Sequence, residues 1–169
     1  MTSQNLLTDP GMAGTWTLEP ERSSVRFVSK TLWGLVPVNG RFTTVSGEAH
    51  VTTDGQLSGR LVIRADSIRT GIGWRDRHLR AADFFDAGNH PDIVVDLTGT
   101  AGGDLSASLT IRGITLPVEL QTTIDRRGDR AVTVNARGQI DRTRWGVSGN
   151  MLGMMPPGTT LLAEAVFVR

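Results

Sequence analysis

The stretch Ser67–Asp86, SIRTGIGWRDRHLRAADFFD, is the one good helix candidate in a sequence that otherwise alternates like β-strands. Gly73 is placed to begin the helix, and Asp76 then falls in the first turn, where the helix dipole favours an anion. Gly88, Asn89 and Pro91 follow as stop signals. The stretch therefore predicts one helical excursion inside an all-β chain.

At about 100° per residue, this helix has a charged side and an apolar side. The charged side holds Asp76, Arg77, Arg80 and Asp83, and the apolar side holds Trp74, His78, Leu79, Ala81, Ala82 and Phe85. Arg75 falls inside the apolar arc, where a charge needs a partner. Two partners are open: a nearby carboxylate in a structural ion pair, or an anionic group of a ligand that lies against the apolar side.

On both sides of this stretch the chain alternates apolar and polar residues with the period of two that is typical of strands. In one such segment Ile93, Val95 and Leu97 share a face. The pattern predicts about eight strands, most of them joined by short turns. The chain lacks a strand–helix–strand rhythm, so we expect an antiparallel sheet. The last strand reaches Arg169 and can pair with the first, which favours a closed barrel.

Several strands place only small residues on the predicted inner face: Gly59, Ala65, Ala107, Ala136, Gly138, Ala163 and Ala165. A barrel of about eight strands either fills itself with side chains or holds one ligand. The small residues leave room for a ligand, and they equally suit a tightly packed, tapered core. Periodicity does not separate these two possibilities.

Composition narrows the classes of protein. The chain has 169 residues, 20 glycines, no cysteine and a net charge of +1. The lack of cysteine excludes disulfides, thiol catalysis and Cys-ligated metals, and the near-neutral charge gives no indication of nucleic-acid binding. His50, His78 and His90 have no recognised ligand spacing, so we expect no metal. We also expect no cofactor.

Residues 1–14 are predicted to be a flexible leader, and residues 15–169 one domain. The N-terminus has no basic region followed by an apolar region, as a signal peptide would. No apolar run is long enough to cross a bilayer. Taken as a full-length chain, the sequence therefore predicts a cytoplasmic protein without a transmembrane segment.

Five ordered motifs between Trp16 and the C-terminus resemble those of a known family. They are WTLEP at 16–20 with Ser24, Val25 and Phe27; VNGRF at 38–42 with Gly47; RDRHL at 75–79 with DFFD at 83–86 and Pro91; LTIRGITLPV at 109–118; and IDR at 140–142 with Trp145 and Gly146. The chain resembles the YceI family of lipocalin-like proteins. The resemblance implies an eight-stranded antiparallel lipocalin-like barrel with one short helical excursion between strands. It also implies a long apolar pocket for a polyisoprenoid, such as an isoprenoid quinone or a prenyl phosphate.

The expected function is to bind such a lipid for storage, shielding or transfer, without catalysis. The candidate pocket residues are Phe27, Trp33, Phe42, Leu61, Ile63, Trp74, Leu79, Phe84, Phe85, Val95, Leu109, Ile111, Trp145, Met151 and Met154. Arg75, Arg69 and Arg142 are the candidates for an anionic head group. The expected partner is a long-chain lipid; whether the chain forms a homodimer stays open.

Two other classes of function remain as alternatives. An enzyme acting on an apolar substrate could use Asp76 and His78 as an acid–base pair, although the sequence has no nucleophile motif or glycine-rich phosphate loop. A ligand-free barrel could serve as a structural or partner-binding domain. A prenyl lipid that co-purifies, turnover of a substrate, and a dry packed interior distinguish the three.

Overall fold

A computed structural model describes residues 6–31, 35–149 and 156–169, with the side chains of residues 30 and 31 excluded. This part of the chain forms twelve strands. They are β1 (Gly14–Leu18), β2 (Ser24–Thr31), β3 (Val36–Phe42), β4 (Val45–Val51), β5 (Leu57–Arg64), β6 (Ile68–Arg69), β7 (Asp92–Gly99), β8 (Ser106–Ile111), β9 (Ile114–Val118), β10 (Gln121–Arg127), β11 (Ala131–Asp141) and β12 (Gly158–Val168). The helices are α2 (Gly73–Leu79) and the short 3-10 turns η1 (Pro10–Met12), η2 (Pro20–Arg22), η4 (Ala65–Ser67) and η5 (Arg142–Trp145).

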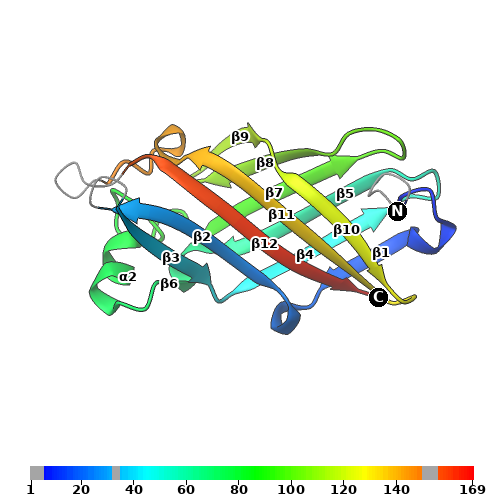
Figure 1. The fold of residues 1–169 in the computed structure, drawn as a ribbon, viewed down its shortest axis with the longest axis horizontal. Helices are drawn as coiled ribbons and strands as arrows, with labels where there is room; N and C mark the ends of the chain where they lie inside the picture. Colours follow the sequence, from blue (N-terminus) through cyan, green and yellow to red (C-terminus); the bar gives the residue numbers. More distant parts are fainter. Residues whose placement is uncertain (1–5, 32–34, 150–155) are drawn as a thin grey trace.

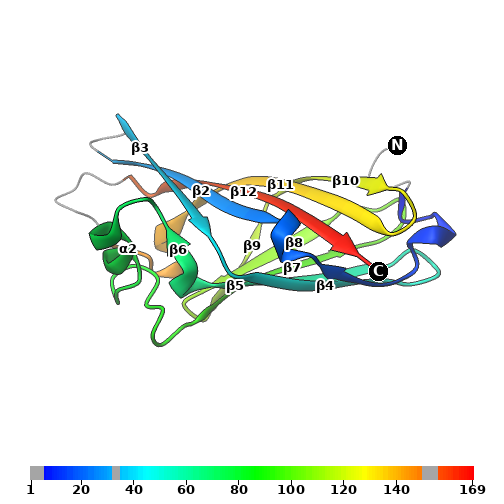
Figure 2. The same cartoon turned by 90° about the horizontal axis from the view of Figure 1, so that it is seen from below.

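All strands belong to one antiparallel sheet in the order β6-β3-β2-β12-β1-β4-β5-β7-β8-β9, with β11 added to β12 and β10 added to β11 (Figure 1). The sheet bends over itself: β2, β12, β11 and β10 form one layer, and β4, β5 and β7 form the other (Figure 2). Strand β12 pairs with β11 on one side and with β2 and β1 on the other. The predicted pairing of the last strand with the first is therefore confirmed.

The all-β antiparallel architecture with one helix is confirmed, but the closed eight-stranded barrel is not. The sheet has twelve strands, and no ladder within the described ranges joins β8 or β9 to β10 or β11. Strand β9 ends at Val118 and β10 begins at Gln121, so the chain breaks at Glu119 and Leu120. There it leaves β8, the partner of β9, and joins β11, the partner of β10.

The helix begins at Gly73, as expected, but it ends at Leu79 and does not extend to residue 86. The guanidinium of Arg112 donates to the carbonyl oxygens of Ala82 and, at 2.8 Å, Phe84. These carbonyls are therefore taken by a distant side chain, and the segment after Leu79 forms turns. Arg112 itself has φ 53° in the tight turn between β8 and β9, followed by Gly113 with φ 73°, as expected for a type I′ hairpin.

The interior holds two hydrophobic clusters. One lies toward α2 and includes Phe27, Ile63, Leu79 and Phe84. The other lies at the opposite end, where the C-terminus is found (Figure 1), and consists of Leu6, Leu7, Met12, Trp16, Val51, Leu57, Ile124 and Val132. The segment 6–12, within the predicted leader, thus packs against the sheet. The Asp9 carboxylate also pairs with the Arg126 guanidinium at 2.5 Å.

Candidate functional site

A cavity of about 400 Å³ runs between the two layers of the sheet. Its walls are almost entirely apolar because the strands present alternate residues inward, among them Phe27, Ile63, Leu109 and Val134. The volume lies within the range of about 300–1,000 Å³ that is typical of small-molecule sites. A largely apolar cavity of this size fits an apolar ligand.

The two ends of the cavity differ. Trp74, on α2, lines the cavity and is still 54% exposed, so the cavity meets solvent at this end. At the other end Leu7, Met12 and Trp16 line it and are buried. The indole Nε1 of Trp16 donates to the carbonyl oxygen of Met12 at 2.8 Å, which fixes the segment 6–12 across this end. The cavity therefore has a mouth beside α2 and a closed far end.

The structure brings most of the sequence-predicted pocket residues to this cavity. Those that line it are Phe27, Phe42, Leu61, Ile63, Trp74, Leu79, Phe84, Phe85, Val95, Leu109 and Ile111. Trp33, Met151 and Met154 lie outside the described residues. Of the three head-group candidates, Arg75 and Arg142 line the cavity, whereas Arg69 does not.

Trp145 is buried but is absent from the lining. Its Nε1 donates to the carbonyl oxygen of Leu109 at 2.9 Å, which ties η5 to β8. Gly146 ends η5 with φ 75°, a conformation that glycine adopts at little cost. Trp145 therefore packs against β8, a strand of the cavity wall, without lining the cavity itself.

Arg142 enters the cavity from the first residue of η5. Asp141 caps this turn by accepting from the amide of Thr143 at 2.9 Å, which fixes the start of η5. The residue is only 7% exposed. Its Nη1 donates to the carbonyl oxygen of Val147 at 2.5 Å, and its guanidinium lies 5.9 Å from the centre of the Phe84 ring. Burial lowers the pKa of Arg142 from its usual value.

Arg75 reaches the mouth from α2 and contacts a threonine. Its Nε donates to the hydroxyl of Thr70 and its Nη2 to the carbonyl oxygen of Thr70, both at 2.8 Å. The same hydroxyl donates to Asp76 at 2.5 Å, and the Thr70 amide also donates to Asp76. Asp76 was expected on the exposed side of the helix, and this is wrong, since it is 6% exposed. It turns back to hold the loop that precedes α2.

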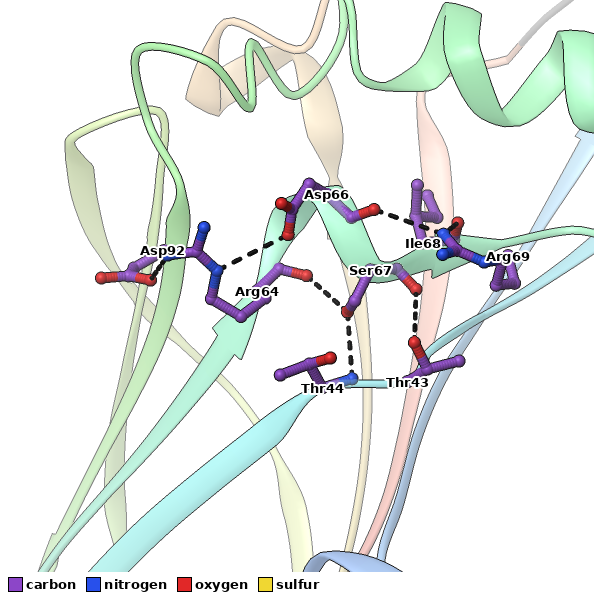
Figure 3. A network of polar contacts seen from close by, with 8 residues as sticks. All are labelled: Thr43, Thr44, Arg64, Asp66, Ser67, Ile68, Arg69 and Asp92. Atoms are coloured by element: carbon purple, nitrogen blue, oxygen red, sulfur yellow. Dashed lines mark hydrogen bonds and ion pairs between the residues drawn. The ribbon is translucent and has the colours of Figure 1, made fainter.

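Arg69 takes part in a polar network at the bend between β5 and β6 (Figure 3). Its Nη1 donates to the carbonyl oxygens of Ile68 at 2.7 Å and Asp66 at 3.3 Å. Beside it, Ser67 donates to the Arg64 carbonyl and accepts from the Thr44 amide. The network anchors this bend to the residues between β3 and β4. Arg69 therefore has a structural contact at the bend and lies outside the cavity lining.

The acid–base pair considered from the sequence is not assembled. Asp76 is held by Thr70, whereas the His78 Nε2 lies 3.5 Å from the Asp83 carboxylate at the exposed surface. Within the described ranges, no group of three or more His, Asp or Glu side chains is arranged to hold a metal ion.

Sequence reasoning missed several cavity residues. Leu7 and Met12 precede the first strand, and no strand period marks them. Ser29 and Thr159 also line the cavity, where their hydroxyls are hydrogen-bonded to each other at 2.9 Å. Alternation along β2 places Ser29 on the same face as Phe27, so this signal was present in the sequence. Alternation along β12 likewise places Thr159 on the same face as the inward-facing Leu161, two residues later.

Comparison with known proteins shows the family to which this chain belongs. The YceI-like domain family matches residues 16–168. The chain belongs to the YceI family. A UPF0312 protein of Vibrio parahaemolyticus is 25% identical over 114 residues, 63% of this chain and 60% of the relative. The protein YceI of Escherichia coli O157:H7 is 32% identical over 73 residues, 41% of this chain and 38% of the relative. The chain thus spans about 60% or less of the curated YceI relatives named here.

Solved structures with the YceI fold are also similar. BcnA of Burkholderia cenocepacia has a TM-score of 0.77 at 21% identity, with 88% of this chain and 98% of that chain covered. A polyisoprenoid-binding domain from Saccharophagus degradans, implicated in plant cell wall breakdown, has a TM-score of 0.75 at 18% identity, with 90% and 97% covered. At these sequence identities, the similarity of the structures establishes that the fold is shared and nothing more. None of the helices in the described ranges combines the length and apolar character that a membrane span requires.

Proposed function

We propose that this protein binds one long apolar lipid in its cavity, without catalysis, and stores, shields or transfers it. The observation that carries the proposal is the cavity itself: about 400 Å³ of apolar space with a mouth at one end and a closed far end. A polyisoprenoid is the favoured ligand class, because a long flexible chain of apolar units matches an elongated apolar site. The polyisoprenoid-binding domain of Saccharophagus degradans shares this fold, which supports the same class.

The energetics suit a carrier. Each methylene removed from water contributes about 0.8 kcal/mol, so a chain of a few tens of carbons gains on the order of 20 kcal/mol over water. A bilayer offers nearly the same gain. The net preference of the lipid for protein over membrane is therefore small, and the lipid can be released again to an acceptor.

The same cavity argues against the two alternatives. A purely structural domain is expected to fill its interior, because protein cores are close-packed, whereas this interior leaves about 400 Å³ unfilled. An acid–base pair needs both groups together at the site. The Asp76 carboxylate, however, is already engaged by Thr70, and His78, which lines the cavity, lies beside Asp83. A binding protein agrees best with both observations.

Extraction of the purified protein with organic solvent, followed by mass spectrometry, tests the proposal. The matched variants are Ala136→Phe, which puts a ring into the cavity, and Gln139→Phe on the same strand, whose position is exposed and outside the lining. We expect a long-chain prenyl lipid with the wild type and with Gln139→Phe, and little with Ala136→Phe. A folded wild type that neither yields an apolar lipid nor takes one up after delipidation would overturn the proposal.

A further inference from the structure

We propose that the outer surface around the mouth of the cavity, at α2 and the start of β3, docks onto an anionic phospholipid bilayer. Exposed apolar side chains of this surface enter the bilayer interface, and exposed arginines contact the acidic head groups. The proposal concerns the outside of the protein. It therefore goes beyond the proposed function and does not depend on which lipid the cavity binds.

The exposed apolar side chains are the first observation. Large apolar side chains that gather on one exposed surface mark a site of contact with another apolar surface. Most of those that this protein exposes lie at or next to the start of β3, or in α2 and the loop before it. In the described part of the chain, the exposed large hydrophobic residues are Leu35, Val36, Ile72, Trp74 and Ile114.

The fold brings these segments to one end of the molecule. Strands β3 and β6 are antiparallel, with Arg41 opposite Arg69, so the chain that continues from Arg69 into α2 runs back toward the start of β3. Figure 1 and Figure 2 both show α2 and the start of β3 at the same end. Ile114 lies two residues after Arg112, whose guanidinium binds the turns that follow α2.

The charges of this end are the second observation. Across residues 35–41, 69–90 and 142–149, Asp83 is the single exposed acidic residue, whereas four arginines are exposed: Arg41, Arg69, Arg77 and Arg144. The segment 142–149 belongs to this end because the amide of Gly149 donates to the carbonyl oxygen of Asp83 at 2.6 Å. The whole chain has a net charge of only +1, so the positive excess is local.

This combination fits a bilayer better than a second protein. The exposed apolar side chains stand on separate segments, and tryptophan together with basic residues is typical of surfaces that lie at a membrane interface. An arginine held beside an acidic bilayer strengthens binding roughly fivefold. Docking in this orientation places the mouth of the cavity, marked by half-exposed Trp74, directly against the lipids.

The first test measures co-sedimentation of the protein with vesicles of phosphatidylcholine alone and of an equal mixture of phosphatidylcholine and phosphatidylglycerol. We expect the wild type to bind the acidic vesicles at least about tenfold more tightly than the neutral ones, and added salt to reduce the difference, because salt screens exposed charges. R41E/R77E should lose this preference. The control, R127E/R130E, should retain it, because it reverses two exposed arginines at the opposite end, where β10 turns into β11 (Figure 1).

The second test addresses the apolar contacts. L35S/I72S changes two exposed positions outside the cavity lining, so the cavity stays as it is. This variant should bind the acidic vesicles severalfold more weakly than the wild type, because less apolar surface enters the interface. L35M/I72M keeps apolar side chains at both positions and should bind like the wild type. Thermal melting checks that each variant is folded.

Equal affinity of the wild type for the two kinds of vesicle overturns the proposal. Equal losses in R41E/R77E and R127E/R130E do so too, since they would indicate attraction by net charge alone, as does unchanged binding of L35S/I72S. Self-association of the wild type that L35S/I72S abolishes would assign the surface to a second copy of the chain, which also contradicts the proposal.

These outcomes are separate from those of the proposed function. Binding to acidic vesicles without uptake of any lipid into the cavity would support the docking surface and overturn the proposed function. Uptake of a lipid without binding to acidic vesicles would overturn the docking surface alone.

Discussion

Gly40, within the VNGRF segment, lies opposite Phe27 on the neighbouring strand. A Cβ built on Gly40 would approach two atoms of the Phe27 ring at 2.2 Å, which is far closer than side chains pack. The ring therefore covers the glycine, and this contact lets Phe27 lie against the cavity. The motif residue is explained by packing, because no positive φ is recorded for Gly40.

We expect Gly40→Ala to lower the free energy of unfolding by about 1–3 kcal/mol, since overpacking displaces a buried ring. The matched control is Gly59→Ala, on a strand that also borders the cavity, where the nearest atom to the new Cβ would be an ordinary 3.5 Å away. Urea denaturation of both variants measures the difference. Equal destabilisation by the two substitutions would contradict the packing argument.

Asp141 caps the short turn η5, which begins with Arg142. Hydrogen bonds from the hydroxyl and amide of Thr143 lower the pKa of its carboxyl below the ordinary value of 3.8. A lowered folded-state pKa means that the ionised form stabilises the folded state at pH values above the ordinary pKa. That stability is lost as pH falls through the folded-state pKa.

The expected result is a pH-dependent difference between wild type and Asp141→Ala. The variant should be less stable at pH 7, and the difference should shrink below about pH 4, as the wild-type carboxyl becomes protonated. Thermal melting across this range measures it. A difference that is constant from pH 7 to pH 3 would show that the charge of Asp141 contributes nothing.

At the scale of the element, α2 illustrates how a short helix is held. It has seven residues, and its N-cap, Ile72, makes no side-chain capping bond. Isolated helices of this length are not stable in water. The helix is anchored to the preceding loop by Asp76, which accepts hydrogen bonds from the amide and hydroxyl of Thr70.

Asp76→Ala should therefore lower the free energy of unfolding by about 1–3 kcal/mol, the cost of leaving buried donors without an acceptor. The control, Asp83→Ala, removes an exposed carboxylate that lies 3.5 Å from the Nε2 of His78, and it should change stability by less than about 0.5 kcal/mol. Chemical denaturation compares the two. Similar values for both would show that Asp76 does not anchor the helix.

At the scale of the whole molecule, the segment before the first strand closes one end of the cavity. Leu7 is buried and contributes to the lining, although sequence reasoning assigned residues 1–14 to a flexible leader. The structure thus predicts that this segment contributes to the stability of the fold.

Leu7→Ala should cost about 2–5 kcal/mol, as is usual for truncating a buried leucine. Leu35→Ala makes the same chemical change at a side chain that is 82% exposed, and it should be nearly neutral. Melting temperatures of both variants provide the measurement. An unchanged melting temperature for Leu7→Ala would favour the flexible leader.

Local features of the sequence were enough to predict the all-β class, the inward faces of most strands and the start of the helix. Alternation along one strand depends on its own residues, so Leu61 and Ile63 could be placed before any partner was known. The hairpin bend at Arg112 and Gly113 is likewise local, because the conformation of two residues creates it.

Apart from the pairing of the first and last strands, the tertiary structure alone decided which strands pair, where the cavity opens and what each charge contacts. Only Glu119 and Leu120 separate β9 from β10, but the two strands pair with different partners, β8 and β11. Beyond the end of the helix at Leu79, Arg112, which is far away in sequence, binds the carbonyls of Ala82 and Phe84. Asp76 is buried because Thr70 folds back onto it. These contacts join residues that no local period relates, so their geometry follows only from the complete packing of the chain.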